Sequence, residues 1–228
     1  MKDRYLFVVA HPDDELLGAG ATISKLIRKG YFVAVCVLSC KSNTRYDDIA
    51  SVMLETHKLL GISKTFTGNF ETLRFKDEDH HSIVKFIENA IVETQPTVVF
   101  TQHPTDLCND HYITSLCCQE AVRLPQRQLG YKKAIKKFAF MEVPSETEFA
   151  LNSAWGRFTP NYYYEVRRSD VNRKIKLLQM YDYIVRDRPH PRSKDNLTAL
   201  SIVRGSESGY KFAESFQIVF EFGGGARK

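Results

Sequence analysis

The feature that most constrains the fold is a repeated alternation of apolar runs with segments of helical spacing. Three runs carry apolar residues on consecutive positions: residues 5–10, 32–38 and 97–101, the last with a threonine at each end. Four segments with helical spacing follow or separate them: residues 14–29, 47–60, 82–94 and 112–124. Strands that are apolar on both faces, joined through helices, are typical of a parallel sheet with helices on each side. The sequence therefore predicts an α/β fold with a mostly parallel sheet covered by helices on both faces.

The rest of the chain continues this pattern less regularly. Further strands are expected at residues 65–67, 137–142 and 162–166, and further helices at residues 170–185 and 194–203. A chain of 228 residues suits one large α/β domain, and no repeat, low-complexity segment or linker divides it. We therefore expect a single domain over residues 1–228.

Two polar clusters come directly after predicted strands. The first, His11-Pro-Asp-Asp-Glu15, follows the run at residues 5–10, and the second, at residues 101–111, reads TQHPTDLCNDH. Open parallel sheets bind their ligands at the carboxyl ends of the strands. The first cluster alone could be a turn followed by an acidic helix N-terminus, which the helix macrodipole favours. Two such clusters, each at the end of a core strand, point to a functional site.

The residue types in these clusters match a catalytic zinc site. Such sites use three protein ligands and keep a fourth position for water. His11 and Asp14 can face one ion if a turn follows the strand, and His111 can supply the third ligand. Asp13, beside a ligand, could take the proton of the zinc-bound water, whose pKa the ion lowers toward ~7. Iron, cobalt or nickel would also suit this ligand set.

Motifs along nearly the whole chain are shared with one family. Residues 10–15 read AHPDDE and residues 18–22 read GAGAT, while residues 103–111 read HPTDLCNDH. Three stretches toward the C-terminus add support: FTPNYYYEV, HPRS and RGSESGYKFAESF. The chain thereby resembles the LmbE-like (PIG-L type) family of zinc-dependent N-deacetylases, whose segments run A-H-P-D-D-E, G-x-G-G-T and roughly H-P-x-D-x-H-x-D-H.

This resemblance implies a fold, a reaction and roles for single residues. The implied fold is Rossmann-like, and the implied reaction is hydrolysis of the N-acetyl group of an amino-sugar derivative to the free amine and acetate. His11, Asp14 and His111 match the family's zinc ligands, with one Zn²⁺ per chain, and Asp13 matches its general base. The substrate would be a small amino sugar, with a glycoside or a nucleotide sugar both open.

One position departs from the family pattern. The family often has a histidine three residues before the last metal-binding histidine, where it is thought to polarise the carbonyl or stabilise the oxyanion; here that residue is Cys108. A thiol is a weaker oxyanion donor than an imidazolium. His103 could take over as a catalytic residue, or it could simply pack against or cap its loop. Cys108 itself is expected in the wall of the substrate pocket.

Several other residues are weaker candidates. Asp110 is expected to orient a metal ligand or a neighbouring group at the substrate pocket, because metal-binding histidines usually have such partners. Arg45 follows the second apolar run and could hold a hydroxyl or phosphate of the substrate. Arg192 and Glu214 lie in family-like stretches, where burial or a subunit contact explains them as well as catalysis does. Three further histidines are expected at the surface: His57, His80 and His81.

Charge and composition argue against other classes of protein. The net charge of +5 reflects basic residues gathered at 132–137, 167–176 and 186–194, without the interleaved aromatics of a nucleic-acid platform. No apolar run approaches the ~18 residues of a membrane span, and the N-terminus lacks a signal-peptide pattern. The five cysteines include no C-x-x-C pair, which argues against a structural zinc knot. We expect a cytoplasmic protein without a nucleic-acid partner or a membrane span.

The sequence thus predicts a metal-dependent hydrolase that removes an N-acetyl or other N-acyl group from an amino-sugar derivative through a zinc-bound water. The alternative is a catalytically weak carbohydrate-binding or assembly protein on the same scaffold, which Cys108 favours. A nucleotide-binding Rossmann protein is disfavoured, because no G-x-G-x-x-G follows the first strand and three acids lie where phosphate would bind. The sugar, and whether the protein forms a homo-oligomer, are left open.

Overall fold

The structure, a computed structural model, describes residues 2–41, 49–127, 134–150 and 156–223. Within these residues seven strands form one sheet: β1 (Arg4–Val9), β2 (Phe32–Val37), β3 (Lys64–Thr67), β4 (Val98–Gln102), β5 (Lys137–Met141), β6 (Tyr162–Glu165) and β7 (Ala213–Glu221). The helices are α1 (Asp14–Arg28), α2 (Ile49–Leu60), α3 (His80–Thr94), α4 (Asn109–Ala121), α5 (Leu124–Arg127), α6 (Arg168–Leu178) and α7 (Lys194–Ser208), with a short 3₁₀ helix, η1 (Phe75–Asp77).

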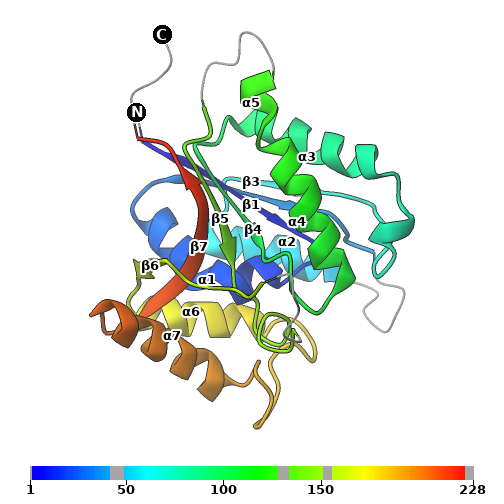
Figure 1. The fold of residues 1–228 in the computed structure, drawn as a ribbon. Coiled ribbons are helices and arrows are strands. Elements are labelled where there is room, and N and C mark those ends of the chain that lie inside the picture. The colour runs from blue at the N-terminus through cyan, green and yellow to red at the C-terminus, as the bar shows by residue number, and fades with distance from the viewer. Residues whose placement is uncertain (1, 42–48, 128–133, 151–155, 224–228) are drawn as a thin grey trace.

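The strands lie in the order β3-β2-β1-β4-β5-β7-β6 (Figure 1). The first five of these run parallel, whereas β7 runs antiparallel to both β5 and β6. The chain adds β2 and β3 on one side of β1 and then returns to the other side of β1 with β4. In α/β sheets such a reversal opens a crevice at the carboxyl ends of the two strands, and ligands bind there.

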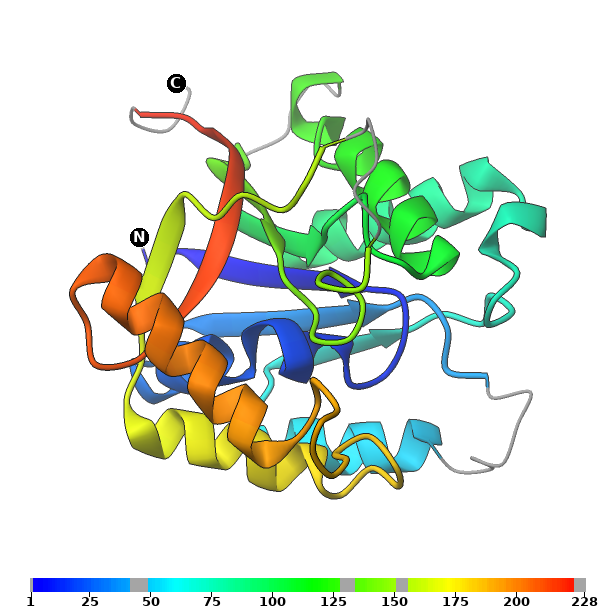
Figure 2. The same ribbon diagram turned by 60° about the horizontal axis from the view of Figure 1, so that its bottom comes forward.

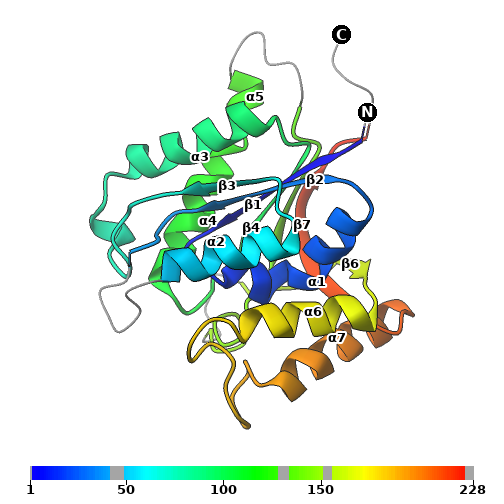
Figure 3. The same cartoon turned by 180° about the vertical axis from the view of Figure 1, so that it is seen from behind.

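Helices cover both faces of the sheet. Helices α3 and α4 pack on one face, and α1, α2, α6 and α7 pack on the other (Figures 1 and 3). In β1, Phe7 and Val9 face the α1 layer, whereas Leu6 and Val8 face the α3 layer. This explains why the strands are apolar on consecutive positions. The predicted Rossmann-like α/β fold is confirmed. No helix of the described ranges is both long and apolar enough to cross a membrane.

The C-terminal part departs from the prediction in two ways. Strand β7, which was not predicted, lies between β5 and β6; Figure 2 shows it in red beside β6. The helix expected at residues 170–185 ends at Leu178. The apolar residues that extended its pattern, among them the buried Tyr181, pack on the same core from a loop instead. Periodicity alone does not distinguish the two, because a loop can also bury every third or fourth residue.

Helix α1 is held near its middle by a buried ion pair from two distant elements. Lys174 of α6 places its ammonium 2.7 Å from a carboxylate oxygen of Glu214 on β7 and donates to the Leu17 carbonyl at 2.7 Å. The Glu214 carboxylate also accepts the backbone amides of Ala21 and Thr22, at 3.2 and 2.7 Å. Both charged side chains are nearly inaccessible to solvent. The pair therefore ties α6 and β7 to the helix that follows the first polar cluster.

Two glycines near the middle of α1 allow close packing. A Cβ on Gly18 would lie 2.7 Å from the Met141 sulfur, and one on Gly20 would lie 3.0 Å from Cγ of Lys174. Real Cβ contacts are essentially never as close as the first of these and seldom as close as the second. These two glycines thus let β5 and the aliphatic part of Lys174 approach the helix.

Candidate metal centre

The two polar clusters of the sequence meet at the crevice between β1 and β4. His11 follows β1, and α1 begins three residues later at Asp14. The second cluster follows β4 and leads into α4, whose first turn carries Asp110 and His111. Residue Val8 of β1 pairs with Thr101 of β4, and each strand ends one residue later, so the two loops leave the sheet at the same edge.

The three predicted metal ligands face one another. Oδ2 of Asp14 lies 3.5 Å from Nδ1 of His11 and 3.3 Å from Nε2 of His111. A charged hydrogen bond would be shorter, about 2.7–2.9 Å. Two N or O ligands bound tetrahedrally to one zinc ion at ~2.0–2.1 Å are about 3.4 Å apart. The observed separations match ligands arranged around an ion.

Each imidazole has a carboxylate partner on its other nitrogen. Nε2 of His11 lies 3.0 Å from Asp110, and Nδ1 of His111 lies 2.9 Å from Asp106. Thr147 in turn donates to Asp106 at 2.7 Å. Such carboxylates fix the tautomer of a metal-binding histidine and raise its basicity. They leave Nδ1 of His11 and Nε2 of His111 facing Asp14.

Asp14 and Asp110 also hold the surrounding backbone. Gln102, the last residue of β4, donates to Oδ2 of Asp14 at 2.7 Å, as does the His11 amide at 2.9 Å. Asp110 is fully buried and accepts the amides of Leu73 and Phe75 besides its contact with His11. This place favours the orienting role of Asp110 over contact with a substrate. The sequence analysis assigned no role to Gln102 or Asp106. Gln102 could have been noticed as a polar residue at the end of an apolar strand, where it lies buried.

The charges of the site are balanced for a divalent cation. Burial alone would lower the pKa of His11, but the neighbouring carboxylates of Asp110 and Asp14 raise it to about 9. Burial opposes charge on His111 too, yet Asp14 and Asp106 hold its pKa well above the usual range. The two imidazoles hold the pKa of Asp14 well below its usual range despite burial. A metal ion binds only to neutral imidazoles, so His11 and His111 would each lose one proton when the ion binds. A divalent ion would restore the two positive charges that are lost.

Asp13 lies beside the ligands in an unusual backbone conformation. Its φ is 93°, in the left-handed region that non-glycine residues rarely adopt, and its side chain is nearly buried. Nη1 of Arg192 lies 3.7 Å from its Oδ2. Burial and the charge of Asp14 raise the pKa of Asp13, whereas Arg192 acts to lower it. Strained residues of this kind cluster at functional sites.

Arg192 connects Asp13 to the loop after β5. Its Nε donates to the Pro144 carbonyl at 3.2 Å and to Oγ of Ser145 at 2.6 Å, and Nη2 lies 3.4 Å from Glu146. Ser145 is also in the left-handed region, with φ 74°. The structure thus brings Arg192 into the site, which the sequence left undecided.

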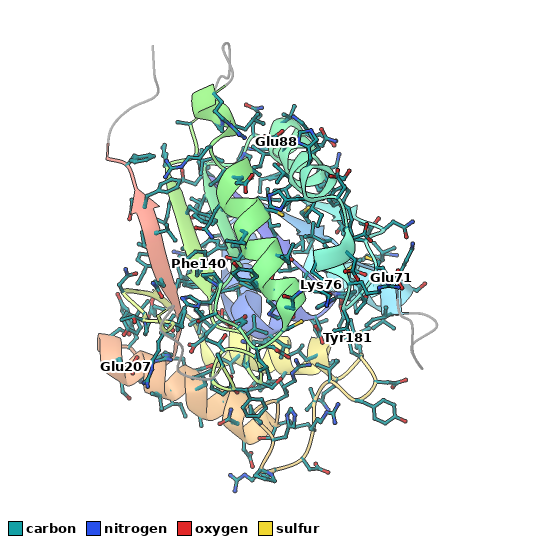
Figure 4. The ribbon with its side chains drawn as sticks, turned by 45° about the vertical axis from the view of Figure 1, so that its right-hand side comes forward. Glu71, Lys76, Glu88, Phe140, Tyr181 and Glu207 are labelled. Atoms are coloured by element: carbon teal, nitrogen blue, oxygen red, sulfur yellow. The ribbon has the colours of Figure 1, made fainter. Side chains whose placement is uncertain are left out.

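His103 is turned toward aromatic side chains. Its ring lies edge-on against Phe140, which is labelled in Figure 4, and Phe158, with centroid distances of 5.3 and 5.6 Å. Nδ1 pairs with the Thr105 hydroxyl at 2.7 Å, and Gln217 also forms a hydrogen bond with the ring. Burial lowers the pKa of His103 to about 4. This place favours the packing role over the catalytic one, which stays a prediction.

Cys108 faces the two imidazoles. It immediately precedes α4, and its sulfur and one nitrogen from each of His11 and His111 lie within 4.8 Å of one another. Burial raises the pKa of its thiol, while the nearby His111 acts in the opposite direction. The residue expected in the wall of a substrate pocket therefore lies beside two of the predicted metal ligands.

The other candidates of the sequence lie elsewhere. The expectation that His57 is exposed is wrong: it is 2% exposed and bonds Glu15 of α1 at 3.1 Å and the Thr65 hydroxyl at 2.8 Å. These two partners satisfy both ring nitrogens and allow α2 to bury the imidazole. His80 and His81 are exposed, as predicted. Arg45 lies outside the described residues. Glu214 serves the ion pair with Lys174 described above.

A cavity of about 400 Å³ adjoins the loop after β5. Seven of its lining residues are polar or charged and come from distant parts of the chain: Thr105, Glu142, Thr147, Glu148, Arg157, Asn196 and Arg204. It shares Pro144 with the contacts of Arg192, and Thr147 with those of Asp106. This volume falls in the range of small-molecule sites, and the mixed charges suit a ligand with many hydroxyl groups.

Comparison with known proteins gives the family and the fold. Residues 6–122 match the PIG-L family model, described as GlcNAc-PI de-N-acetylase. The uncharacterized deacetylase YaiS of Escherichia coli (strain K12) is 29% identical over 144 residues, which cover 60% of this chain and 77% of that protein.

Solved structures with the same fold include proteins of different activity. N,N'-diacetylchitobiose deacetylase from Pyrococcus horikoshii has a TM-score of 0.73 and 19% identity, over 95% of this chain and 84% of that chain. GalB, the 4-carboxy-2-hydroxymuconate hydratase of Pseudomonas putida KT2440, has the same TM-score and identity and covers 100% of both chains. The fold alone therefore does not fix the reaction. The family match spans more than half of the 228 residues and includes both polar clusters, and this chain belongs to the PIG-L (GlcNAc-PI de-N-acetylase) family.

Proposed function

We propose that the protein is a metal-dependent hydrolase that removes an N-acetyl group from an amino-sugar derivative. The observation that carries this proposal is the placement of Asp14 at 3.3–3.5 Å from a nitrogen of each of two imidazoles, with Asp13 beside it. His11, Asp14 and His111 would hold one divalent ion, with zinc preferred. When bound, the ion would polarise the acyl carbonyl and make a water molecule acidic enough to react at neutral pH.

The protein's own groups would carry the proton. Asp13 is adjacent to a proposed ligand without being one itself, so its carboxylate would be available to the attacking water. It takes a proton from that water and passes it to the nitrogen of the leaving amine. Arg192, 3.7 Å from Asp13, holds the carboxylate in place from the loop after β5. Asp106 and Asp110 keep the two imidazoles oriented toward the centre.

The substrate class rests on the family and on the cavity. The family model is named for the removal of an acetyl group from an amino sugar, and a deacetylase that shares the fold acts on a chitobiose. The cavity at the loop after β5 offers carboxylates, two arginines and an amide as partners for sugar hydroxyls. In a glycoside or a nucleotide sugar, the aglycone or the nucleotide would lie outside the metal centre that binds the acetyl group. The alternative, a catalytically weak carbohydrate-binding protein, is favoured by the position of Cys108 among the ligands.

The proposal is tested by acetate release from a panel of N-acetyl sugars, glycosides and nucleotide sugars, with and without added metal. His111→Ala is expected to lose both bound metal and activity. Asp13→Asn is expected to keep the metal and lose about 10²–10⁴ in rate, the usual effect of removing a general base. Asp77→Asn, at an exposed carboxylate of η1, is the matched control and should change neither quantity.

Two results would contradict the proposal. One is metal-loaded protein that releases no acetate from any member of the panel. The other is an Asp13→Asn variant with wild-type turnover, which would assign the proton transfer to a different group.

A further inference from the structure

We propose that Cys108 is itself a metal ligand, so that four protein side chains, His11, Asp14, Cys108 and His111, surround the ion. This inference rests on the metal site of the proposed function and adds a thiolate to it. It assigns metal binding to Cys108, whereas the histidine that the family often has at this position is thought to act on the substrate carbonyl.

The geometry places the sulfur where a fourth ligand would lie. The ligand atoms of His11, Cys108 and His111 are all within 4.8 Å of one another. For Zn–N of ~2.0–2.1 Å and Zn–S of ~2.3 Å, tetrahedral geometry sets the N···S separation at about 3.5 Å. The sulfur and these nitrogens therefore have to approach one another by no more than about 1.3 Å to reach that separation. Asp14, 3.5 Å from Nδ1 of His11 and 3.3 Å from Nε2 of His111, is the remaining ligand of the proposed set, and its oxygens are not part of that 4.8 Å group.

The other four cysteines lie in different surroundings. Cys36, Cys117 and Cys118 are buried in the apolar layer between the sheet and helices α3 and α4. Cys40 is partly exposed at the end of β2, and its sulfur is not grouped with two imidazoles. All five positions belong to the described residues. Cys108 thus differs from the rest in having two histidine nitrogens as neighbours.

A thiolate changes which ion the site prefers. Imidazole and carboxylate ligands accept several divalent metals, whereas a thiolate favours zinc over magnesium or manganese. On binding, the thiol releases its proton to solvent and its sulfur donates a lone pair to the ion. Four protein ligands also describe a closed site, in contrast to catalytic sites that keep one position for water. Water or substrate would then require that one ligand leaves or that the coordination number rises to five.

Cobalt(II) substitution tests the ligand directly, because a sulfur–cobalt bond gives a charge-transfer band in the near ultraviolet. The full-length wild-type protein loaded with one equivalent of Co²⁺ should show this band, and Cys108→Ser should bind Co²⁺ without it. Cys40→Ser is the matched control and should retain the band. Removing a residue that only hydrogen-bonds to a metal ligand typically lowers metal affinity about 10–100-fold. Cys108→Ala, which would remove a ligand itself, should lower zinc affinity by at least this factor in chelator competition.

Alkylation gives a second measurement that does not depend on activity. Iodoacetamide should modify Cys108 in the metal-free protein and not in the zinc-loaded protein, whereas modification of Cys40 should be the same in both states. Co²⁺ bound stoichiometrically by the wild type without a sulfur band would overturn the proposal for Cys108 and leave the proposed function intact. Failure of the wild type to bind any divalent ion would overturn both, and acetate release would be absent as well.

Discussion

The buried pair between Lys174 and Glu214 yields a quantitative prediction about stability. Replacing Lys174 with Met keeps most of the aliphatic volume and removes the ammonium. Glu214 then stays buried, 6% exposed, with its charge offset only by two backbone amides of α1. Removing one partner of a buried ion pair typically costs about 3–5 kcal/mol. Because the two amide bonds remain, we expect the lower end, about 3 kcal/mol.

The effect is large enough to measure by two methods. For a chain of this length, about 1 kcal/mol shifts the thermal midpoint by roughly 2–4 °C, so Lys174→Met should unfold about 6–12 °C earlier. In urea, the midpoint should fall while the slope stays unchanged, because the surface exposed on unfolding is the same. Circular dichroism follows both transitions.

A double-variant cycle and a surface control separate the ion pair from a general packing effect. Lys174→Met combined with Glu214→Gln removes both charges and should recover more than half of the lost stability, because the uncompensated charge is gone. Lys85 lies 2.7 Å from the buried Glu88, the same distance as in the Lys174 pair, but Lys85 is half exposed and Glu88 keeps Arg127 as a partner at 2.6 Å. Lys85→Met should cost only about 0–1 kcal/mol. A loss below about 1 kcal/mol in Lys174→Met, or a double variant as unstable as the sum of the two single variants, would refute the reasoning.

Three further predictions concern the metal centre and its surroundings. Asp106→Asn should weaken zinc binding about 10–100-fold in chelator competition, because it removes the charged partner of His111; unchanged affinity would argue against Asp106 as that partner. Arg192→Met should lower kcat by up to about 10² without loss of metal, because Asp13 would no longer be held in place; a kcat equal to that of the wild type contradicts this. In the folded protein burial lowers the pKa of His103 to about 4, below the ordinary 6.5, so the unfolded state binds the extra proton and wild-type stability should fall as pH drops from about 6.5 to 4. The urea midpoint of His103→Gln should depend less on pH in this window, and parallel pH curves would show that His103 does not titrate in this way.

The sequence predicted the fold best where a local pattern of residues is compatible with only one structural environment. Strands such as residues 32–38, apolar on consecutive positions, require cover on both faces, and this predicted the layers of the fold. His11, Asp14 and His111 were predicted to lie together because they follow core strands of a parallel sheet, and the structure brings their side chains to one edge of that sheet. That convergence depends on topology alone and needs no knowledge of side-chain conformations.

Features that depend on a distant partner were not predicted. His57 was expected at the surface, because nothing near it in the chain indicates that Glu15 and Thr65 satisfy its two nitrogens. Strand β7 was missed because Glu214 and Ser215 are polar, although both lie in the interior with partners from other elements. A buried polar residue differs from an exposed one only through its partners, and these are set by the tertiary structure.

The position of β7 also has a consequence for the order in which the protein can assemble during its synthesis. Residues 213–221 are translated after the other elements, yet they form an interior strand, and Glu214 bonds an amide 193 residues earlier in the chain. Closing so long a loop is entropically costly and slows folding. Until β7 emerges from the ribosome, β6 has no neighbour in the sheet and Lys174 has no counter-ion. A chain halted before residue 213 would contain both polar clusters and the whole family match, and would still lack the strand that fastens α1 behind them.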